Sequence, residues 1–150
     1  MKNALLIVLL GVLSFALAQE TGGGAMSGGS SGATTVQLSE SDELGQFLVD
    51  AEGMTLYLFL NDTDNTSNCD DECIENWPPL LTEGDATAGE GVDASLLGTT
   101  ERTDGTVQVT YGGWPLYYWV RDEAPGDTTG QAVGEVWYVV SPQGEAVTGE

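Results

Sequence analysis

The chain has 150 residues, enough for one domain, and carries 24 acidic side chains against three basic ones, with no histidine. A field this negative repels nucleic acid and anionic membrane surfaces, so we exclude both as partners. Four explanations of the charge stay open. They are solubility in high salt, a cationic or cell-envelope partner, binding of divalent cations, and a surface bias without a specific role.

Residues 1–18 have the pattern of a secretory signal peptide. Lys2 supplies a positive start, residues 4–17 are almost wholly apolar, and Ala18 ends a small-x-small cleavage site. The apolar run is short for a membrane span, and we expect cleavage rather than an uncleaved anchor. Cleavage removes Lys2 and leaves two arginines against 24 acids, a net charge of −22. We therefore expect a location that is extracellular, periplasmic or at the cell surface, with no span after cleavage.

Residues 19–35 are rich in Gly and Ser and predict a flexible linker. The domain is expected over residues 36–150. Its first part predicts a β-hairpin, with one strand at residues 47–50, a tight turn at 51–53 and a second strand at 55–60.

The same pattern returns 60 residues later. Gly53–Asp62 reads GMTLYLFLND and Gly113–Asp122 reads GWPLYYWVRD, with Gly, Leu, Tyr, an aromatic residue and Asp at matching places. We interpret this as a duplication, with repeat one at about 45–80 and repeat two at about 105–140. A glycine in the same turn position of both copies predicts positive φ there. The motif residues are Tyr57, Phe59, Asp62 and Trp77 in the first copy and Tyr117, Trp119, Asp122 and Trp137 in the second.

Alternation along the repeated strand places Leu56, Leu58 and Leu60 on one face and the aromatic residues on the other. Both faces are apolar, so we expect central strands covered on both sides. For the aromatic residues, core packing and a binding surface with solvent-facing tyrosine hydroxyls are both open. The repeated Asp62 and Asp122 fit a structural role, either capping backbone N–H groups or accepting from a tyrosine hydroxyl. A glycosidase-like pair is the alternative.

After the first hairpin, residues 69–77 predict a short helix with Cys69, Cys73 and Trp77 on one face. Two cysteines in an exported protein predict a disulfide. A structural bridge, a redox-active bridge and a metal–thiolate role are the three alternatives.

The loop between the hairpin and this helix has oxygen-bearing residues at every second position. Asp62, Asp64 and Asn68 have the spacing of a calcium loop. Ser67 stands where such a loop has Gly, and Cys73 where it has the bidentate Glu. A calcium ion is the one cofactor this pattern suggests, and a solvated acidic loop is the other interpretation.

The second half begins with a hairpin signal, Thr103-Asp104-Gly105, between strands at 99–102 and 106–110. The second copy of the motif follows. Residues 80–98 and 123–134 predict irregular loops, and residues 136–140 (VWYVV) predict a strand.

These motifs resemble the secreted-repeat family of tandem-repeat lipoproteins, whose signature is Tyr-x4-Asp within a Gly-x-x-Leu-Tyr-x-aromatic segment. The sequence has the signature at Tyr57/Asp62 and at Tyr117/Asp122, together with a Cys-x3-Cys-x3-Trp-Pro-Pro motif that starts at Cys69. The resemblance implies no activity, because the function of the family is unknown. Lipoproteins carry a Cys directly after the signal, whereas Ala18 precedes Gln19 here, so we expect a form without a lipid anchor.

The sequence therefore predicts a mainly β domain built from two related hairpin repeats and one short disulfide-bearing helix. With no histidine and no serine-nucleophile motif, we expect a protein that is not an enzyme. The expected function is a secreted or cell-surface domain for binding or envelope structure. The alternatives are a thiol–disulfide or electron-transfer accessory protein outside the cytoplasm, and a calcium-binding acidic domain.

Overall fold

The computed structural model describes residues 34–148, which form a mainly β domain with short helical turns. The predicted signal peptide and most of the predicted linker lie outside the described residues. The strands are β1 (Thr35–Ser41), β2 (Gly45–Asp50), β3 (Tyr57–Phe59), β4 (Thr87–Ala88), β5 (Leu97–Glu101), β6 (Val107–Tyr111), β7 (Trp114–Pro115) and β8 (Trp137–Val139). The helical turns are α2 (Glu72–Asn76), η2 (Ala94–Leu96) and η3 (Val133–Glu135).

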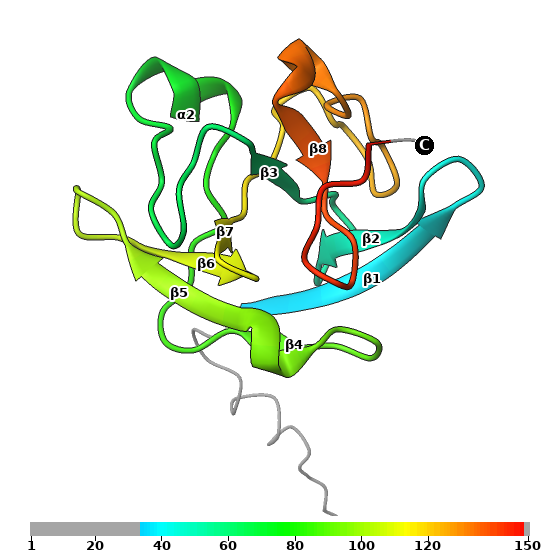
Figure 1. The fold of residues 1–150 in the computed structure, drawn as a ribbon, viewed down its shortest axis with the longest axis horizontal. Helices are drawn as coiled ribbons and strands as arrows, with labels where there is room; N and C mark the ends of the chain where they lie inside the picture. Colours follow the sequence, from blue (N-terminus) through cyan, green and yellow to red (C-terminus); the bar gives the residue numbers. More distant parts are fainter. Residues whose placement is uncertain (1–33, 149–150) are drawn as a thin grey trace, which may run out of the picture. The chain divides into compact units, whose positions relative to one another are not determined.

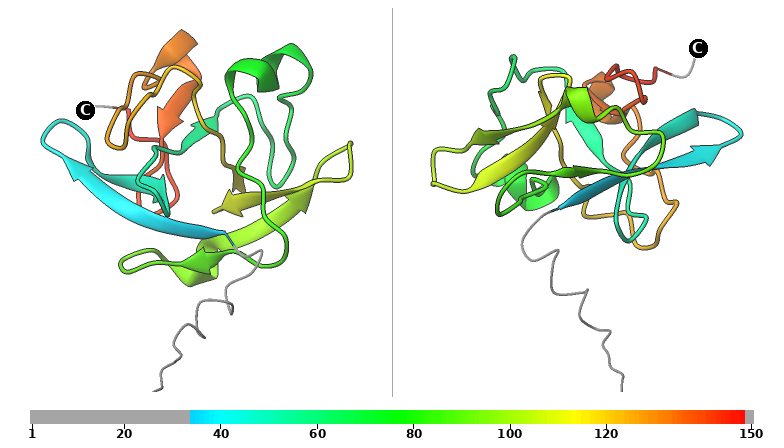
Figure 2. Two further views of the ribbon diagram at one scale, coloured as in Figure 1. Left: turned by 180° about the vertical axis from the view of Figure 1, so that it is seen from behind. Right: turned by 90° about the horizontal axis from the view of Figure 1, so that it is seen from below.

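The strands form three small sheets, ordered β2–β1–β4, β3–β8 and β5–β6–β7. Figure 1 shows the β1–β2 and β5–β6 hairpins below, with α2 and β8 above them, and Figure 2 shows the same arrangement from behind and from below. Both hairpins are antiparallel, and β4 is parallel to β1. The antiparallel hairpin and the helical turn recur with the period of the sequence, since β5–β6 and η3 lie about 60 residues after β1–β2 and α2.

The turns of the two motif segments confirm the expectation for their glycines. Gly53 has φ +90° and Gly113 has φ +89°, a region that side chains with a Cβ rarely adopt. Each glycine also contacts the loop of the other repeat. A Cβ on Gly53 would lie 3.0 Å from Pro125, and one on Gly113 would collide with Asp64. Both turns are thus fixed by conformation and by close approach.

The second strand of the first hairpin differs from the prediction. Only Val49 and Thr55 bridge across the turn, and β3 pairs with β8 instead of with β2. The predicted coverage on both faces is also wrong at the strand ends, because Leu60 is 41% exposed and Val120 is 48% exposed. The strand ends at Phe59, and the chain then turns outward, with Asp62 N–H donating to Phe59 O at 3.0 Å.

The predicted helix over 69–77 is shorter in the structure. It begins at Glu72 because Asp71 adopts φ +53°, outside the helical region. Cys69 therefore lies before the helix and not on one helical face with Cys73 and Trp77. The segment 80–98, predicted as irregular, contains β4, η2 and the start of β5.

The last segment of each repeat pairs with the other repeat. In β8, Val139 is the partner of Tyr57, and Val140 O accepts from Leu48 N–H at 2.9 Å. In the reverse direction, Pro79 bridges Tyr117, and Leu80 O accepts from Val109 N–H at 2.9 Å. Leu80 and Val140 are both buried in the main core. Each repeat thus completes the sheet of its partner, and neither repeat is a closed unit.

Candidate functional site

The two motif tyrosines lie at a pseudo-twofold axis. Tyr57 N–H donates to Tyr117 O at 2.8 Å, and Tyr117 N–H donates to Tyr57 O at 3.0 Å. Both residues are fully buried. Reciprocal contacts of this kind define an isologous interface, here formed between two halves of one chain.

Each motif tyrosine binds the motif aspartate of the other repeat. The Tyr57 hydroxyl donates to Asp122 Oδ2 at 2.6 Å, and the Tyr117 hydroxyl donates to Asp62 Oδ2 at 2.7 Å. Bonds to an ionised acceptor are short and about twice as strong as neutral ones. The alternative in which the hydroxyls face solvent is wrong, because these hydroxyls join the repeats inside the domain.

The second oxygen of each aspartate holds the loop that follows it. Asp62 Oδ1 accepts from Asn68 N–H at 2.6 Å, and Asp122 Oδ1 accepts from the N–H and the hydroxyl of Thr129 at 2.9 and 2.6 Å. The aspartates thus both cap a backbone N–H group and accept from a tyrosine, so the two structural roles expected as alternatives occur together.

Burial dominates the electrostatics of these pairs. It raises the pKa of the Tyr57 hydroxyl far above its ordinary value, and the hydrogen bond to Asp122 adds to the rise. Burial likewise raises the pKa of Tyr117. The Asp62 carboxyl has a raised pKa from burial, opposed by the Asn68 N–H and the Tyr117 hydroxyl. Both tyrosines therefore stay protonated donors across the physiological range.

The other four motif residues form a column of stacked rings. Trp77 and Trp137, which the repeat relates, are parallel with centroids 3.8 Å apart. Trp119 stacks on the outside of Trp77 at 4.0 Å, and Phe59 stacks on the outside of Trp137 at 4.2 Å. The column therefore runs Phe59–Trp137–Trp77–Trp119, with its centre at the pseudo-twofold axis.

The outer ends of the column differ. The Arg121 guanidinium carbon lies 5.8 Å above the Trp119 ring, in reach of a cation–π interaction. The residue 60 positions earlier is Asn61, which follows Phe59 by the same two positions. Trp119 Nε1 is the buried side-chain polar atom that lacks a hydrogen-bond partner within residues 34–148.

The first repeat carries a disulfide that the second lacks. Cys69 and Cys73 are bonded with Cα atoms 5.2 Å apart, as the sequence predicted. Thr129 and Val133 occupy the equivalent positions in repeat two. Cys69 is buried and Cys73 is half-buried.

Arg102 is buried beneath this disulfide loop, and the sequence interpretation missed it. Its guanidinium donates to Cys69 O at 2.7 Å, to Gln108 Oε1 at 2.8 Å and to Ser67 Oγ at 2.9 Å. It also pairs with the half-exposed Asp70 at 3.3 Å. The sequence offered one signal for it. Only two arginines remain after cleavage of the signal peptide, so each is a candidate for a specific role.

The three residues of the predicted calcium loop are partly occupied by other contacts. Both Asp62 oxygens accept hydrogen bonds, and Asn68 Nδ2 donates to Asn61 O at 2.8 Å. Asp62 and Asp64 line a cavity of about 180 Å³ beside Gly113. Within residues 34–148, no group of three or more His, Cys, Asp or Glu side chains is arranged to hold a metal ion.

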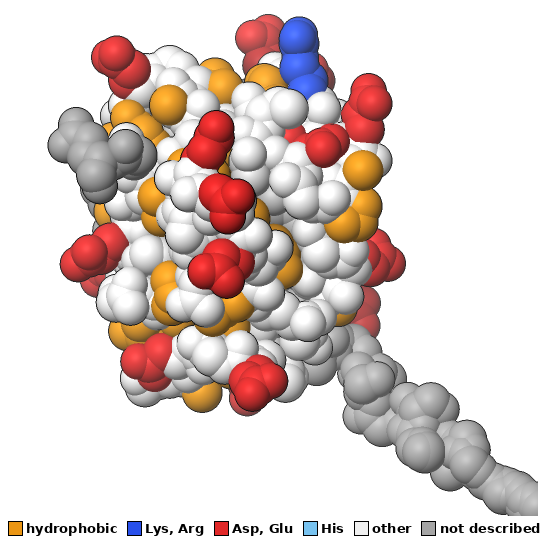
Figure 3. Space-filling view, turned by 90° about the vertical axis from the view of Figure 1, so that its right-hand side faces the viewer, with side chains coloured by type: hydrophobic (Ala, Val, Ile, Leu, Met, Phe, Trp, Pro, Cys, Tyr) orange, Lys and Arg blue, Asp and Glu red, His pale blue; other side chains and the backbone are white. Residues whose placement is uncertain are grey.

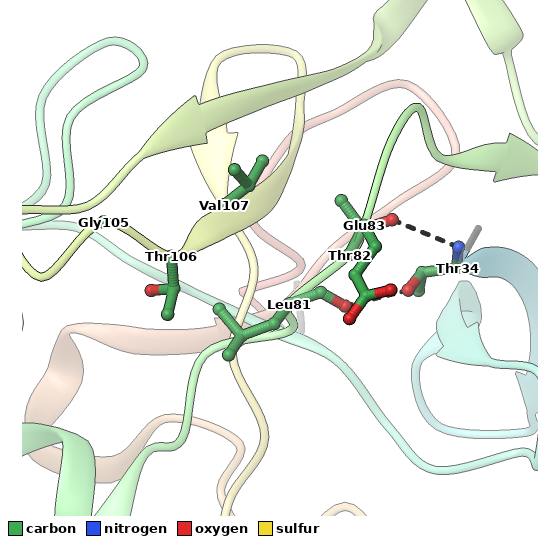
Figure 4. A pocket seen from close by; sticks show the side chains of 7 residues that line it. All are labelled: Thr34, Leu81, Thr82, Glu83, Gly105, Thr106 and Val107. Carbon is green, nitrogen blue, oxygen red and sulfur yellow. Dashed lines mark hydrogen bonds between the residues drawn. The ribbon is translucent and has the colours of Figure 1, made fainter. Parts of the chain in front are cut away.

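A cavity of about 480 Å³ lies away from the motif and is open to solvent; Figure 4 shows the side chains that line it. Its lining residues are Thr34, Leu81, Thr82, Glu83, Gly105, Thr106 and Val107. Figure 3 shows a face of the molecule on which Asp and Glu side chains are spread rather than gathered.

One of three comparisons with known proteins places the chain in a family. A family model described as "secreted repeat of unknown function" matches residues 39–81 and 98–141. Searches of curated proteins and of solved structures returned no match. In the described part of the chain, no helix has the length and apolar character needed to cross a membrane. The two matched segments cover more than half of the chain, and the protein belongs to this family of secreted repeats.

Proposed function

We propose that the protein is a non-catalytic secreted or cell-surface domain that acts by binding or as part of the cell envelope. The observation that carries this proposal is the position of the family signature. The motif tyrosines and aspartates bind one another in the interior, between the repeats. Their hydroxyl and carboxylate groups serve to join two halves of a scaffold, which supports a structural role for the signature instead of a role in acid–base chemistry.

The charge of the surface supports a cationic partner. Arg102 is buried in a hydrogen-bond network, and Arg121 lies over the Trp119 ring. Within residues 34–148, Arg121 is thus the one exposed basic side chain, while the acidic residues are mostly exposed. A surface of this kind attracts basic proteins, basic polymers or counterions held in an envelope.

A sedimentation assay with washed cell envelopes of the source organism tests the proposal. We expect the purified mature chain to bind the envelopes saturably and to release as NaCl is raised, because screened charges attract less. A variant tests the role of the surface charge. It neutralises three exposed acids, by Asp42→Asn, Asp85→Asn and Glu90→Gln, and leaves the core unchanged. We expect it to bind the envelopes more weakly than the unchanged chain. Binding that is neither saturable nor salt-sensitive would contradict the cationic partner, and catalytic turnover of an envelope component would contradict the non-catalytic role.

The thiol–disulfide alternative is decided by the reduction potential of the Cys69–Cys73 bridge. The burial of Cys69 limits attack on its sulfur, and Asp70, Asp71 and Glu72 disfavour a thiolate nearby. We expect a potential well below the glutathione range, as for structural bridges. A potential in the range of known oxidoreductases would instead favour redox work.

The calcium alternative concerns Asp62, Asp64 and the cavity between them and Gly113. Its test is the melting temperature in CaCl2 and in NaCl of equal ionic strength. A larger rise in CaCl2, lost in an Asp64→Asn variant, would establish a calcium site. Equal rises would assign the effect to screening alone.

A further inference from the structure

The loop that follows β3 contains two acceptor sequences for N-glycosylation. Asn61-Asp62-Thr63 and Asn65-Thr66-Ser67 both have the form Asn-x-Ser/Thr with a residue other than proline in the middle. Such a sequence is an acceptor for an N-linked glycan, and it is used only where it lies on the surface of an exported protein. Both sequences lie in a polar loop of a chain that belongs to a family of secreted repeats.

The structure distinguishes the two sequences. Asn61 and Thr63 are both exposed, and neither side chain makes a hydrogen bond within the described residues. Ser67 is half-buried, and its hydroxyl contacts the Tyr117 hydroxyl at 2.6 Å and accepts from Arg102 at 2.9 Å. The hydroxyl that completes the second sequence is therefore engaged inside the domain, whereas the hydroxyl of the first is open to solvent.

The relation between the two repeats predicts what a substituent at position 61 would face. In repeat two, Arg121 follows Trp119 by two residues and lies over the outer face of that ring, at 5.8 Å. In repeat one, Asn61 follows Phe59 by two residues, and the inner face of Phe59 is already covered by Trp137 at 4.2 Å. A substituent on Asn61 is thus placed to cover the outer end of the aromatic column.

A sugar suits this place better than the bare amide does. The C–H face of a pyranose ring is apolar and weakly positive, and the face of an aromatic ring is negative. The half-buried Phe59 and the neighbouring Leu60, 41% exposed, offer that apolar contact. Asp62 accepts hydrogen bonds from Tyr117 and Asn68, and these contacts fix the start of the loop. The neighbouring Asn61 is thereby held at the surface beside Phe59 and Leu60.

We propose that Asn61 is an N-glycosylation site whose first sugar lies on Phe59. The donor is an oligosaccharide linked to a polyprenyl phosphate or pyrophosphate, transferred by an oligosaccharyltransferase. The Asn61 amide nitrogen forms a bond to the anomeric carbon, the bond from that carbon to the lipid phosphate oxygen breaks, and the amide proton passes to a base of the transferase. The lipid phosphate leaves with the bonding electron pair. The proposal rests on export of the chain, as the proposed function does.

Peptide mass spectrometry of the protein secreted by its source organism tests the proposal. We expect the peptide with Asn61 to carry a glycan mass, Thr63→Ala to abolish it, and Thr63→Ser to retain it. Asn65→Gln is the matched control and leaves the modification unchanged. An exported protein with an unmodified Asn61 peptide, or with a glycan on Asn65 alone, would overturn the proposal. A chain retained inside the cell and unmodified would overturn both this proposal and the secreted location.

The contact with Phe59 is tested separately. We expect the glycosylated protein to melt at a higher temperature than Asn61→Gln, and we expect this difference to shrink in a Phe59→Leu background. An equal difference in both backgrounds would show that the sugar does not rest on Phe59.

Discussion

Replacement of Tyr57 by Phe removes one hydroxyl and leaves the ring in place. That hydroxyl donates to Asp122 Oδ2 at 2.6 Å and accepts from Gly130 N–H at 3.1 Å, and all three groups are in the interior. Gly130 cannot move away to find another acceptor easily. A Cβ there would already lie about 3 Å from Trp77, Trp119 and Tyr57, so its backbone is tightly enclosed.

The expected loss of unfolding free energy follows from the two hydrogen bonds that the Tyr57 hydroxyl makes, to Asp122 and from Gly130. A hydrogen bond to a charged group contributes about 1.5–3 kcal/mol, and a buried donor left without a partner costs about 1–3 kcal/mol. The two effects overlap in part, because the Asp122 carboxylate keeps its bonds to Thr129. We therefore expect Tyr57→Phe to lower the free energy of unfolding by about 3 kcal/mol.

The measurement is equilibrium unfolding in urea at fixed salt, read by tryptophan fluorescence, since Trp77 packs edge-on against Tyr57. Tyr138→Phe is the matched control. Tyr138 is half-buried, its hydroxyl has no hydrogen-bond partner in the described structure, and its loss should cost less than about 0.5 kcal/mol. If the two variants lose the same free energy, the Tyr57–Asp122 bond does not hold the repeats together.

Four further predictions concern the buried arginine, the tyrosine hydroxyls, the disulfide and the surface charge. Arg102→Leu should lower the free energy of unfolding, measured by urea titration, by about 3 kcal/mol, because Gln108 Oε1 and Cys69 O lose their buried hydrogen-bond donor. Arg121→Leu, the control, should lower it by less than about 1 kcal/mol. Equal losses in the two variants would refute the role of Arg102. The free energy of unfolding should fall as pH rises above about 10, because the pKa of Tyr57 is raised in the folded state and only the unfolded state then releases the proton. Urea titrations at pH 8–11 measure this, and a free energy that does not change with pH would contradict it. Reduction of Cys69–Cys73 should lower stability by about 2 kcal/mol without unfolding the domain at 25 °C, and circular dichroism that shows complete unfolding would refute this. The melting temperature should rise with NaCl, because counterions screen the repulsion among 24 acidic side chains, and a constant value would count against that explanation.

The features that the sequence predicted correctly depend on local rules. Positive φ at Gly53 and Gly113 follows from turn chemistry within a few residues, and the disulfide follows from the cysteine count and the exported context. The duplication itself was readable because both copies keep the same spacing. These signals require no knowledge of how the two copies are arranged in space.

The partners of the motif residues could not be predicted for the same reason. Two copies with identical spacing leave it undecided whether Asp62 binds the tyrosine of its own repeat or that of the other. The answer depends on the exchange of the last strand of each repeat, which brings Tyr117 to Asp62. Strand exchange changes the connections between copies but leaves the pattern within each copy the same.

The errors at Leu60, Val120 and Cys69 have local causes that periodicity does not report. Apolar alternation continues to Leu60 and Val120, but the chain turns at Asp62 and Asp122 to place the carboxylates, so the residues just before them become exposed. Cys69 leaves the helix because Asp71 takes a positive φ. In these places a buried carboxylate or a turn overrides the hydrophobic pattern.

Double-mutant cycles between Tyr57 and each motif aspartate test the exchanged pairing of the repeats most directly. The cycle of Tyr57→Phe with Asp122→Ala should give a coupling energy above about 1 kcal/mol, and the cycle with Asp62→Ala should give less than about 0.5 kcal/mol. The reverse ranking, with Tyr57 coupled to Asp62 of its own repeat, would contradict the exchange on which the architecture depends.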